Sequence, residues 1–515
     1  MEERSHYKIT AENNTPTRAS GTRIKALLLL LGTVAAFLPL LFFNGERYSV
    51  DSPSILLYGE WSQLGAFLDS YRYFGALIAH LYYYAGHDPI GNCLPDTILF
   101  ILLAAVGTTI LVKTVSEQLK IDRWLPVAAL DLAAVLAIEN VWFCEILTFP
   151  ESIFLSGVGV LLCDLAVVLF IRYRNVKGLA ASAVCLILST AVYQQFITVF
   201  TIFAVAELGC EILTNERITV KSAFLRYAGT AAFVLGSGVV YLLIGKAACK
   251  AFGMDGGSRV ATTASDVIQN ALYYLTHQRS FLKGRGYFDT EIMTVSVLFV
   301  AAVWFVIFAL NVKKKKRLAV GLIVLLAFAL AYCSGFLPGV VSQSHDTRAV
   351  FGVFSVFFLF VCGIVTLCKN NRIVLSSVAC ILAVFLAANA VETAKTAIDQ
   401  KAMTRSDLQI VDSVIREIED YEERSGSTVK TVYYCYDLSP TPARTWRVFS
   451  FDFSMSSVFT LRSSKYTPEV REALFEFVEM PEDIYKQHFE GRDWQELDLD
   501  EQLFFVGESA YLCIY

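Results

Sequence analysis

Residues 44–87 read NGERYSVDSPSILLYGEWSQLGAFLDSYRYFGALIAHLYYYAGH and separate the first two strongly apolar segments of the chain. The segment is too charged to lie within lipid, where a charged side chain near the membrane centre costs roughly 2.5–3.5 kcal/mol. It is also rich in Tyr, Trp and Phe, whose side chains favour the boundary between membrane and water. We therefore expect residues 44–95 to form a loop on the membrane surface, where a carboxylate can meet a substrate carried by a lipid.

The composition of the whole chain indicates a membrane protein. Of its 515 residues, 55% are hydrophobic and only 18% are charged, and the mean hydropathy is +0.52. Soluble domains usually carry about 25% charged residues, so most of this chain is expected to lie within a bilayer. The 12 Cys lie mostly inside apolar runs, without a C-x-x-C pair or a Cys/His spacing. We interpret them as packing residues rather than metal ligands.

The distribution of basic residues predicts the topology. Arg18, Arg23 and Lys25 precede the first apolar run, and Lys and Arg concentrate in cytoplasmic loops, so residues 1–25 are expected to be a cytoplasmic tail. About eleven apolar segments of membrane-spanning length follow. They are residues 26–43, 95–112, 124–138, 152–171, two within 178–213, 224–248, 292–312, 318–340, 350–367 and 373–391. The sequence therefore predicts an all-α polytopic membrane domain over residues 26–392, with the N-terminus inside and the C-terminus outside.

Three segments between the predicted spans need an interpretation of their own. Residues 71–86 are short for a span and carry Arg72, so we expect a surface helix, with a short tilted span as the alternative. Residues 139–151 are expected to be a short outer loop. Residues 178–213 are too long for one span, and a tight outer turn is predicted at the polar sequence Tyr-Gln-Gln, residues 193–195.

Residues 393–515 are expected to form a small extracytoplasmic α/β domain. This part carries roughly ten more acidic than basic residues, whereas residues 1–392 carry roughly five more basic ones. Periodicity and Pro positions predict helices at 406–423, 468–477 and 481–489, and β-branched and aromatic residues predict strands at 428–436 and 502–515. Cys435 and Cys513 fall in these strands; we favour two unpaired thiols, with a disulfide as the alternative.

The candidate functional residues lie in loops that the topology places on the outer side. A carboxylate can take the proton from an acceptor hydroxyl while Arg or Lys holds a phosphate leaving group. Asp51 and Arg348 stand at the ends of spans, where a charge is costly unless it is used. The catalytic candidates are Asp51, Glu60 and Glu46, and the binding candidates are Arg72, Arg348, His345, Glu145, Arg285, Tyr193 and Gln194. For each of them the alternative is an ordinary solvated loop residue.

The chain resembles the bacterial membrane glucosyltransferases that act on O-antigen and similar surface polymers, which are polytopic glycosyltransferases of the GT-C class. The resemblance covers about residues 25–390. It is carried by an acid soon after the first span, by YRYFGALIAHLYYY at residues 71–84, by the short acidic second loop, by the Tyr-Gln-Gln turn, and by HDTRAVFG at residues 345–352.

The resemblance implies a polyprenyl-phosphate sugar donor, a glycan acceptor and a site at the outer face of the bilayer. Such enzymes place their catalytic acid in the first outer loop, which corresponds to Asp51 here. They often have two adjacent acids there, whereas this chain has Asp51-Ser52, so Glu46 and Glu60 are alternative bases. The donor phosphate would face Arg348 or Arg72. A single displacement without a covalent intermediate would invert the configuration of the sugar.

Other classes of function remain alternatives at this stage. The same intramembrane charges could serve a lipid flippase or a secondary transporter, although no internal repeat is evident and charges within spans are few. A surface-polysaccharide polymerase or ligase would use a similar lipid-linked substrate. No P-loop, G-x-G-x-x-G context or nucleic-acid partner is expected. No cofactor is required, although Asp51, Glu145 and Glu151 could converge on a divalent metal.

Overall fold

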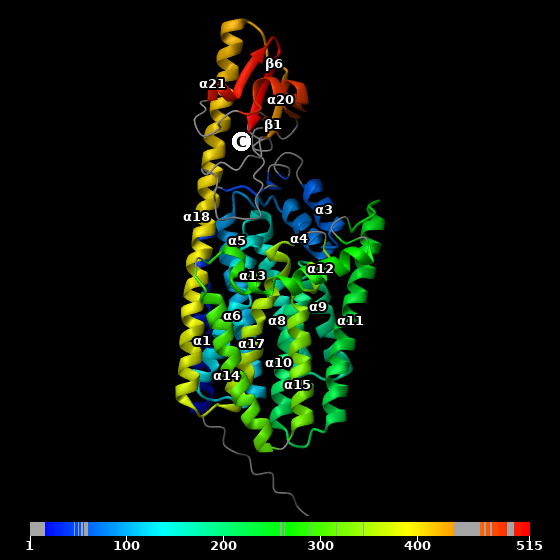
Figure 1. The fold of residues 1–515 in the computed structure, drawn as a ribbon, viewed down its shortest axis with the longest axis vertical. Helices are drawn as coiled ribbons and strands as arrows, with labels where there is room; N and C mark the ends of the chain where they lie inside the picture. Colours follow the sequence, from blue (N-terminus) through cyan, green and yellow to red (C-terminus); the bar gives the residue numbers. More distant parts are fainter. Residues whose placement is uncertain are drawn as a thin grey trace, which may run out of the picture.

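The structure is a computed structural model, and it is a bundle of long helices with a small sheet at one end (Figure 1). It describes residues 16–45, 47–49, 51–52, 55, 60–257, 260–261, 263–288, 290–315, 317–342, 345–436, 464–467, 470–473, 476–491 and 499–514.

Eight helical stretches within the described residues are long and apolar enough to cross a membrane, so the protein is a multi-pass membrane protein. They comprise α1 (Pro16–Phe37) with η1 (Leu38–Phe43), α5 (Cys93–Gln118), η2 (Pro150–Ser152) with α8 (Ile153–Arg172), α10 (Phe196–Thr214), α11 (Val220–Ala251), α14 (Ile292–Lys315), η4 (Thr347–Ser355) with α17 (Val356–Leu367), and the first part of α18 (Arg372–Ser425).

Three further apolar helices account for the rest of the predicted spans. Helix α6 (Trp124–Leu136) and helix α7 (Val141–Leu147) meet at a bend of 51° and pass the same test only as a pair. Helices α9 (Val176–Thr190) and α15 (Leu318–Ser334) are apolar but shorter. Every predicted span therefore coincides with helical structure, while the count of eleven spans remains a prediction.

The segments predicted to be outer loops gather at the end of the bundle that also carries the sheet (Figure 1). They include α3 (Glu60–Asp69), α4 (Tyr73–Tyr84), α12 (Ala264–Thr276), α13 (Gln278–Leu282) and η3 (Gly284–Gly286), whereas α16 (Leu337–Val340) is a separate short helix at the end of the predicted span 318–340. Helix α4 has 12 residues, far fewer than the roughly 20 that a span requires. This length agrees with a surface helix at residues 71–86. The predicted Tyr-Gln-Gln turn is also present, because α9 ends at Thr190 and α10 begins at Phe196.

The C-terminal part contains a four-stranded sheet in the order β4-β1-β6-β5, in which β1 is parallel to β4 and β6 and β5 is antiparallel to β6. A separate antiparallel pair is formed by β2 and β3. The elements are β1 (Thr431–Tyr436), β2 (Ser464–Thr467), β3 (Val470–Ala473), β4 (Glu476–Glu479), α20 (Glu482–His488), α21 (Leu499–Gln502), β5 (Leu503–Val506) and β6 (Ser509–Ile514).

Two local predictions for this part are wrong in detail. Residues 470–473 and 476–479 are strands rather than a helix, because pairing of β4 with β1 and of β3 with β2 overrides a weak local helical pattern. Within the segment predicted as one strand at 502–515, the described residues 503–514 form a hairpin, and Gly507 supplies the positive φ of 59° at its turn. Cys435 and Cys513 are direct neighbours in the register of β1 and β6, and neither takes part in a disulfide.

Helix α18 connects the bundle to the sheet without a break. It has 54 residues and ends at Gly426, which adopts the left-handed conformation with φ of 69°. Tyr48 and Ile90, from the two ends of the first loop, pack in one apolar cluster with Val411 and Val432. The first loop, α18 and the sheet therefore share a packed core. The predicted domain boundary at residue 392 lies inside α18.

Candidate active site

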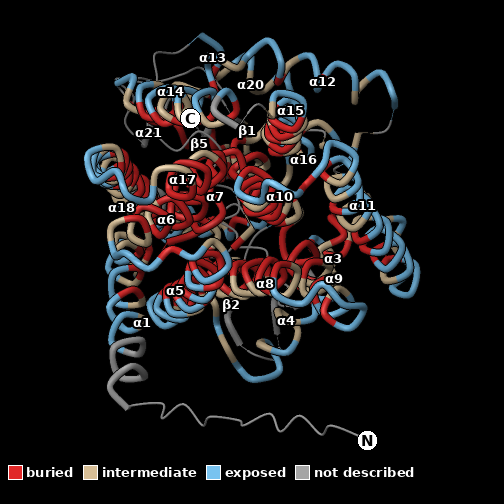
Figure 2. The backbone as a smooth tube through the Cα atoms, turned by 90° about the horizontal axis from the view of Figure 1, so that it is seen from below, coloured by how far each residue is buried: buried red, intermediate tan, exposed pale blue. Residues whose placement is uncertain are grey.

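Helix α7 folds back into the bundle, so residues 139–151 are not the exposed outer loop that the sequence predicts. All seven residues of α7 are buried, and Figure 2 shows α7 within the buried centre of the bundle. The side chain of Asn140 caps this helix by accepting a hydrogen bond from the backbone N–H of Phe143 at 3.0 Å. The physical reason is the apolar sequence VWFC-IL around Glu145, which is too short to span but favours burial.

Glu145 joins α7 to the loop that contains His345 and Arg348. Its carboxylate accepts hydrogen bonds from the hydroxyls of Tyr287 and Thr347, and from the backbone N–H of Arg348 at 3.0 Å. Three donors satisfy a carboxylate that is almost completely removed from solvent. Glu145 therefore orders the late outer loop, and it does so from the bundle interior.

Arg348 is held at its guanidinium group by two neighbours. Its Nη2 donates to Oδ2 of Asp346 at 3.1 Å, and its guanidinium carbon lies 5.0 Å from the centroid of the Phe149 ring. The Arg348 side chain is 19% exposed. A guanidinium oriented in this way, with part of its surface open, is suited to bind a phosphate.

Arg72 lies close to the same place and comes from the first loop. Its guanidinium carbon is 4.4 Å from the centroid of the Tyr193 ring, and Tyr193 interacts electrostatically with both Arg72 and Arg348. Burial raises the pKa of Tyr193, and the two guanidinium groups oppose that rise. The side-chain amide of Gln194 donates to the backbone carbonyl of Ser70 at 2.5 Å. Gln194 therefore helps to fix the position of the segment that carries Arg72.

Arg285 and His345 form a second contact between loops. Arg285 Nη1 donates to the backbone carbonyl of His345 at 2.5 Å, and its guanidinium lies over the ring of Phe281 at 5.3 Å. The His345 ring centroid is 4.0 Å from that of Tyr273. Burial and the charge of Arg285 lower the pKa of His345, so its imidazole is neutral at pH 7.

Asp51 is paired with an acid from a different loop. The hydroxyl of Ser49 accepts a hydrogen bond from the backbone N–H of Asp51 at 3.2 Å and donates to Oε1 of Glu151 at 2.9 Å. The hydroxyl of Ser52 donates to the other oxygen of Glu151 at 3.4 Å. The two carboxylates interact electrostatically; Glu151 is buried and Asp51 is half-buried. Asp51 is thus the more exposed acid of this pair.

One short turn contacts both the Asp51 pair and Arg348. Phe149, which contacts Arg348, is two residues from Glu151, which interacts with Asp51, and two residues of chain span at most about 7 Å. The Asp51–Glu151 pair and the Arg348 guanidinium therefore lie at the same end of the bundle, and we call this region the Asp51–Arg348 surface. It can remove a proton from a hydroxyl and stabilise a phosphate that leaves.

The family is shown by comparison with known protein families. The family described as Glucosyl transferase GtrII matches residues 40–367. The chain belongs to the GtrII glucosyltransferase family. The protein is accordingly a membrane glycosyltransferase, and the predicted resemblance to bacterial O-antigen-type membrane glucosyltransferases is confirmed. Comparison with curated proteins finds no match.

The GtrII match contains every candidate site residue and ends at the last residue of α17. Helix α18 beyond that point and the sheet lie outside the match. Of the three catalytic candidates, Glu46 lies outside the described residues, and the structure describes the backbone of Glu60 at the start of α3 but not its side chain. Asp51 is therefore the catalytic candidate whose surroundings are described.

Several residues at the site were not singled out by sequence. Thr347 belongs to the HDTR sequence and could have been found there, whereas Phe149 and Tyr287 carry no local signal. In the described part of the chain, no three His, Cys, Asp or Glu side chains are grouped in a way that could hold a metal ion. The carboxylate of Glu145, one of the three acids that could converge on a metal, accepts hydrogen bonds from Tyr287 and Thr347.

Proposed function

We propose that this GtrII family member transfers a sugar, most simply glucose, from a polyprenyl-phosphate donor to a cell-surface polysaccharide. The observation that supports the proposal best is that one short turn holds both Phe149, which contacts Arg348, and Glu151, which interacts with Asp51. A general base and a phosphate-binding cation on one surface are what transfer from a phosphate-linked donor requires.

In this proposal, the donor lies with its lipid tail among the helices and its phosphate against Arg348, with Arg72 beside it. Asp346 and Phe149 hold the Arg348 guanidinium before the donor arrives, which lowers the entropic cost of binding. Arg285 contributes by fixing the backbone at His345. The negative charge that develops on the phosphate during transfer is stabilised by these guanidinium groups.

Asp51 acts as the general base. It removes the proton from an acceptor hydroxyl, and the oxygen attacks the anomeric carbon from the face opposite the phosphate. The bond between the anomeric carbon and the phosphate oxygen breaks, and polyprenyl phosphate leaves with both electrons of that bond. The sugar configuration inverts because this is one displacement. Ser49 positions Asp51 by accepting a hydrogen bond from its backbone N–H, and the Ser49 hydroxyl in turn donates a hydrogen bond to Glu151.

The site is proposed to face the extracytoplasmic side, with the N-terminus in the cytoplasm. The opposite end of the bundle carries the basic residues that favour a cytoplasmic position, among them Arg172, Lys177, Arg217 and Lys313. Residues 393–515 would then lie outside with the site. Their acidic character suits a position away from the anionic inner leaflet.

The surroundings of the mid-span acids favour an enzyme over a transporter. Asp131 accepts a hydrogen bond from Thr33 at 2.9 Å, and Asp164 accepts one from Thr108 at 3.3 Å. Both acids are buried and bonded between helices, as structural polar groups are. They do not adjoin the Asp51–Arg348 surface, because each lies within a span and that surface lies at the bundle end.

The proposal is tested with purified full-length protein in liposomes. Radiolabelled polyprenyl-phosphate glucose and UDP-glucose are offered separately with a lipopolysaccharide acceptor, and label in the acceptor is measured. Transfer from the lipid-linked donor alone is the expected result. Transfer from the nucleotide sugar in the absence of polyprenyl phosphate would contradict the proposed donor.

A further inference from the structure

A second group of cationic side chains lies at the edge of the bundle, separate from the Asp51–Arg348 surface. It lies in the segment that follows α12, a helix that runs across the end of the bundle at its periphery (Figures 1 and 2). Ile268, Leu272 and Leu275 on one side of α12 are 60%, 53% and 70% exposed. On the other side, the Asn270 amide donates to the backbone carbonyls of Val340 and Ser342.

The orientation of α12 indicates contact with a membrane surface. Its exposed apolar residues recur at spacings of four and three, so they form one stripe on the helix. A helix with such a stripe, lying across the ends of spanning helices, is expected to rest in the boundary region of the bilayer. We therefore expect bilayer lipid to cover the stripe and the segment that follows α12 to lie near the depth of lipid phosphates.

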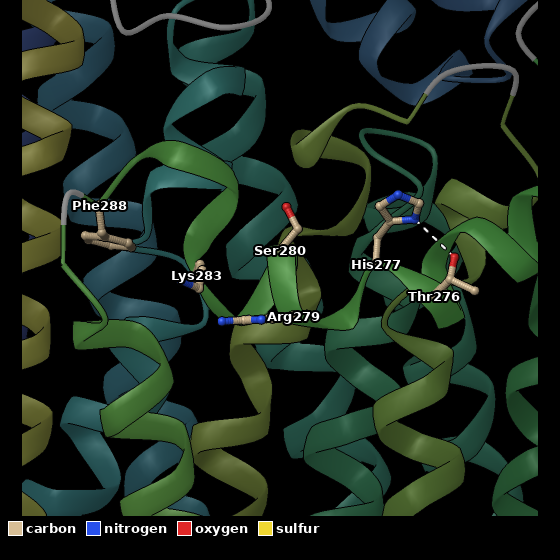
Figure 3. Close-up of a pocket in the computed structure, with 6 residues that line it drawn as sticks. All are labelled: Thr276, His277, Arg279, Ser280, Lys283 and Phe288. Carbon is tan, nitrogen blue, oxygen red and sulfur yellow. Dashed lines mark hydrogen bonds between the residues drawn. The ribbon is translucent and has the colours of Figure 1, made fainter.

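A pocket of about 470 Å³ opens where α12 ends. Figure 3 shows its lining residues, which come from the last turn of α12, from α13 and from the segment after η3. They are Thr276, His277, Arg279, Ser280, Lys283 and Phe288. The lining thus offers two permanent cations, an imidazole and two hydroxyls, and it contains no carboxylate among the residues that the structure describes.

One acid lies beside the pocket and restrains its cations. Glu291 forms an ion pair with Lys283 and interacts electrostatically with Arg279. Glu291 itself is exposed, and its Oε2 lies 3.0 Å from the Thr294 hydroxyl oxygen. Glu291 carries one negative charge, whereas Arg279 and Lys283 carry two positive charges. The three side chains together therefore have a net charge of about +1. An incoming phosphate oxygen can share both cations.

An apolar face continues from the pocket along α14. The hydroxyl of Thr294, in the first turn of α14, donates to the backbone carbonyl of Leu282 at 3.0 Å, so α14 begins directly at the pocket. Val295, Leu298 and Val306 on α14 are exposed large hydrophobic residues. A lipid whose phosphate occupied the pocket would lay its chain along this face.

We propose that the pocket formed by Arg279, Lys283, Ser280 and His277 binds the phosphate of a membrane lipid. The shared chemistry is a phosphate group on an apolar chain, from either an anionic phospholipid of the bilayer or a polyprenyl phosphate. Arg285, two residues after Lys283, contacts the His345 loop, so a lipid bound here lies next to the loop that carries Arg348. The site does not depend on the proposed transfer reaction.

The test measures lipid retained by the purified full-length protein. Protein in mild detergent is given phosphatidylglycerol or phosphatidylcholine, and bound lipid per protein is counted by native mass spectrometry. Phosphatidylglycerol should be retained more strongly, because the choline cation is repelled by Arg279 and Lys283. Arg279→Gln and Lys283→Gln should each weaken retention of phosphatidylglycerol roughly tenfold, the effect of losing one charge-assisted contact.

Lys250→Gln is the matched control, because it removes an exposed cation at the end of α11, at the same end of the bundle. It should retain lipid as the wild type does. Retention unchanged in both pocket variants, or equal retention of both phospholipids, would overturn the site. Added polyprenyl phosphate then identifies the source: displacement of phosphatidylglycerol shows that the pocket takes polyprenyl phosphate, and persistence shows that it takes bilayer phospholipid.

Discussion

At the scale of single residues, Arg348 is the cation whose geometry is set before substrate binds. Asp346 holds one of its terminal nitrogens at 3.1 Å, and the Phe149 ring lies under the guanidinium. Arg348→Ala should reduce donor use about a hundredfold, because charge-assisted bonds worth roughly 3 kcal/mol are lost. Arg348→Lys should recover only part of this, since an ammonium lacks the planar fork of donors.

The Arg348 variants are compared in the donor-dependent transfer assay, with KM for the donor and kcat measured separately. Arg217→Ala is the control, because Arg217 is an exposed cation at the opposite end of the bundle. It should leave both constants unchanged. Wild-type KM and kcat in both Arg348 variants would show that the late outer loop does not contact the donor phosphate.

At the scale of elements, α18 holds the first loop against the turn that carries Glu151. The Gln400 side chain accepts from Arg47 at 2.9 Å and donates to the backbone carbonyls of Tyr48 and Thr148 at 3.2 and 2.6 Å. Arg47 also donates to the carbonyl of Leu147 at 2.8 Å. Burial lowers the pKa of Arg47 to about 10, so this bridging group is still charged at pH 7.

Gln400→Leu should therefore disturb the site through position rather than through chemistry. The change leaves buried partners of Gln400 unsatisfied, which should lower stability by about 2–3 kcal/mol. We expect kcat to fall while KM for the donor changes little, because the hydrogen bonds of Gln400 are to Arg47, Tyr48 and Thr148. Gln409→Leu, on the exposed side of the same helix, is the control and should leave kcat unchanged. An unchanged kcat in Gln400→Leu would refute the positioning role.

The elements also show what sequence could and could not predict. The long helices were predictable because an apolar run of about 20 residues has few other stable arrangements. Helix α7 was missed, because a seven-residue apolar segment beside Glu139 looks like a loop when only spans are sought. The strand at residues 470–473 was missed because its partner, not its local pattern, determines its conformation.

The sequence indicates candidate site residues but not the contacts between them. Residue type and predicted topology single out Asp51, Arg72, Glu145 and Arg348, and their roles stay predictions. The pairing of Asp51 with Glu151 depends on two loops that only the bundle brings together, and no local pattern encodes it. For the same reason, the bridge from Gln400 to Tyr48, more than 350 positions away, could not be read from the chain.

At the scale of the whole molecule, the central question is which face of the membrane the site and the sheet share. Residues 393–515 are proposed to lie outside, together with every candidate site residue. A Ser427→Cys variant should react in intact cells with a thiol reagent that cannot cross the membrane. Reaction only after lysis would show that residues 393–515 lie in the cytoplasm and would contradict the proposed topology. The control is Arg217→Cys at the opposite end, which should react only after lysis.

The measurement that tests the account most directly is sugar transfer by Asp51→Asn. The change keeps the size of the side chain and removes the proton acceptor, so transfer should fall about a hundredfold or more, the usual contribution of a general base. Donor binding and protein abundance should persist, since Asp51 is half-buried and its contact with Ser49 is through its backbone N–H. Glu46→Gln and Glu60→Gln are the controls and should each lose less.

The result that the account predicts is therefore an abundant, donor-binding Asp51→Asn protein that transfers almost no sugar. Normal transfer by Asp51→Asn together with an inactive Glu46→Gln or Glu60→Gln would assign the base to another acid of the same loop. Wild-type transfer rates in all three variants would contradict the central claim, that a carboxylate of the first loop deprotonates the acceptor.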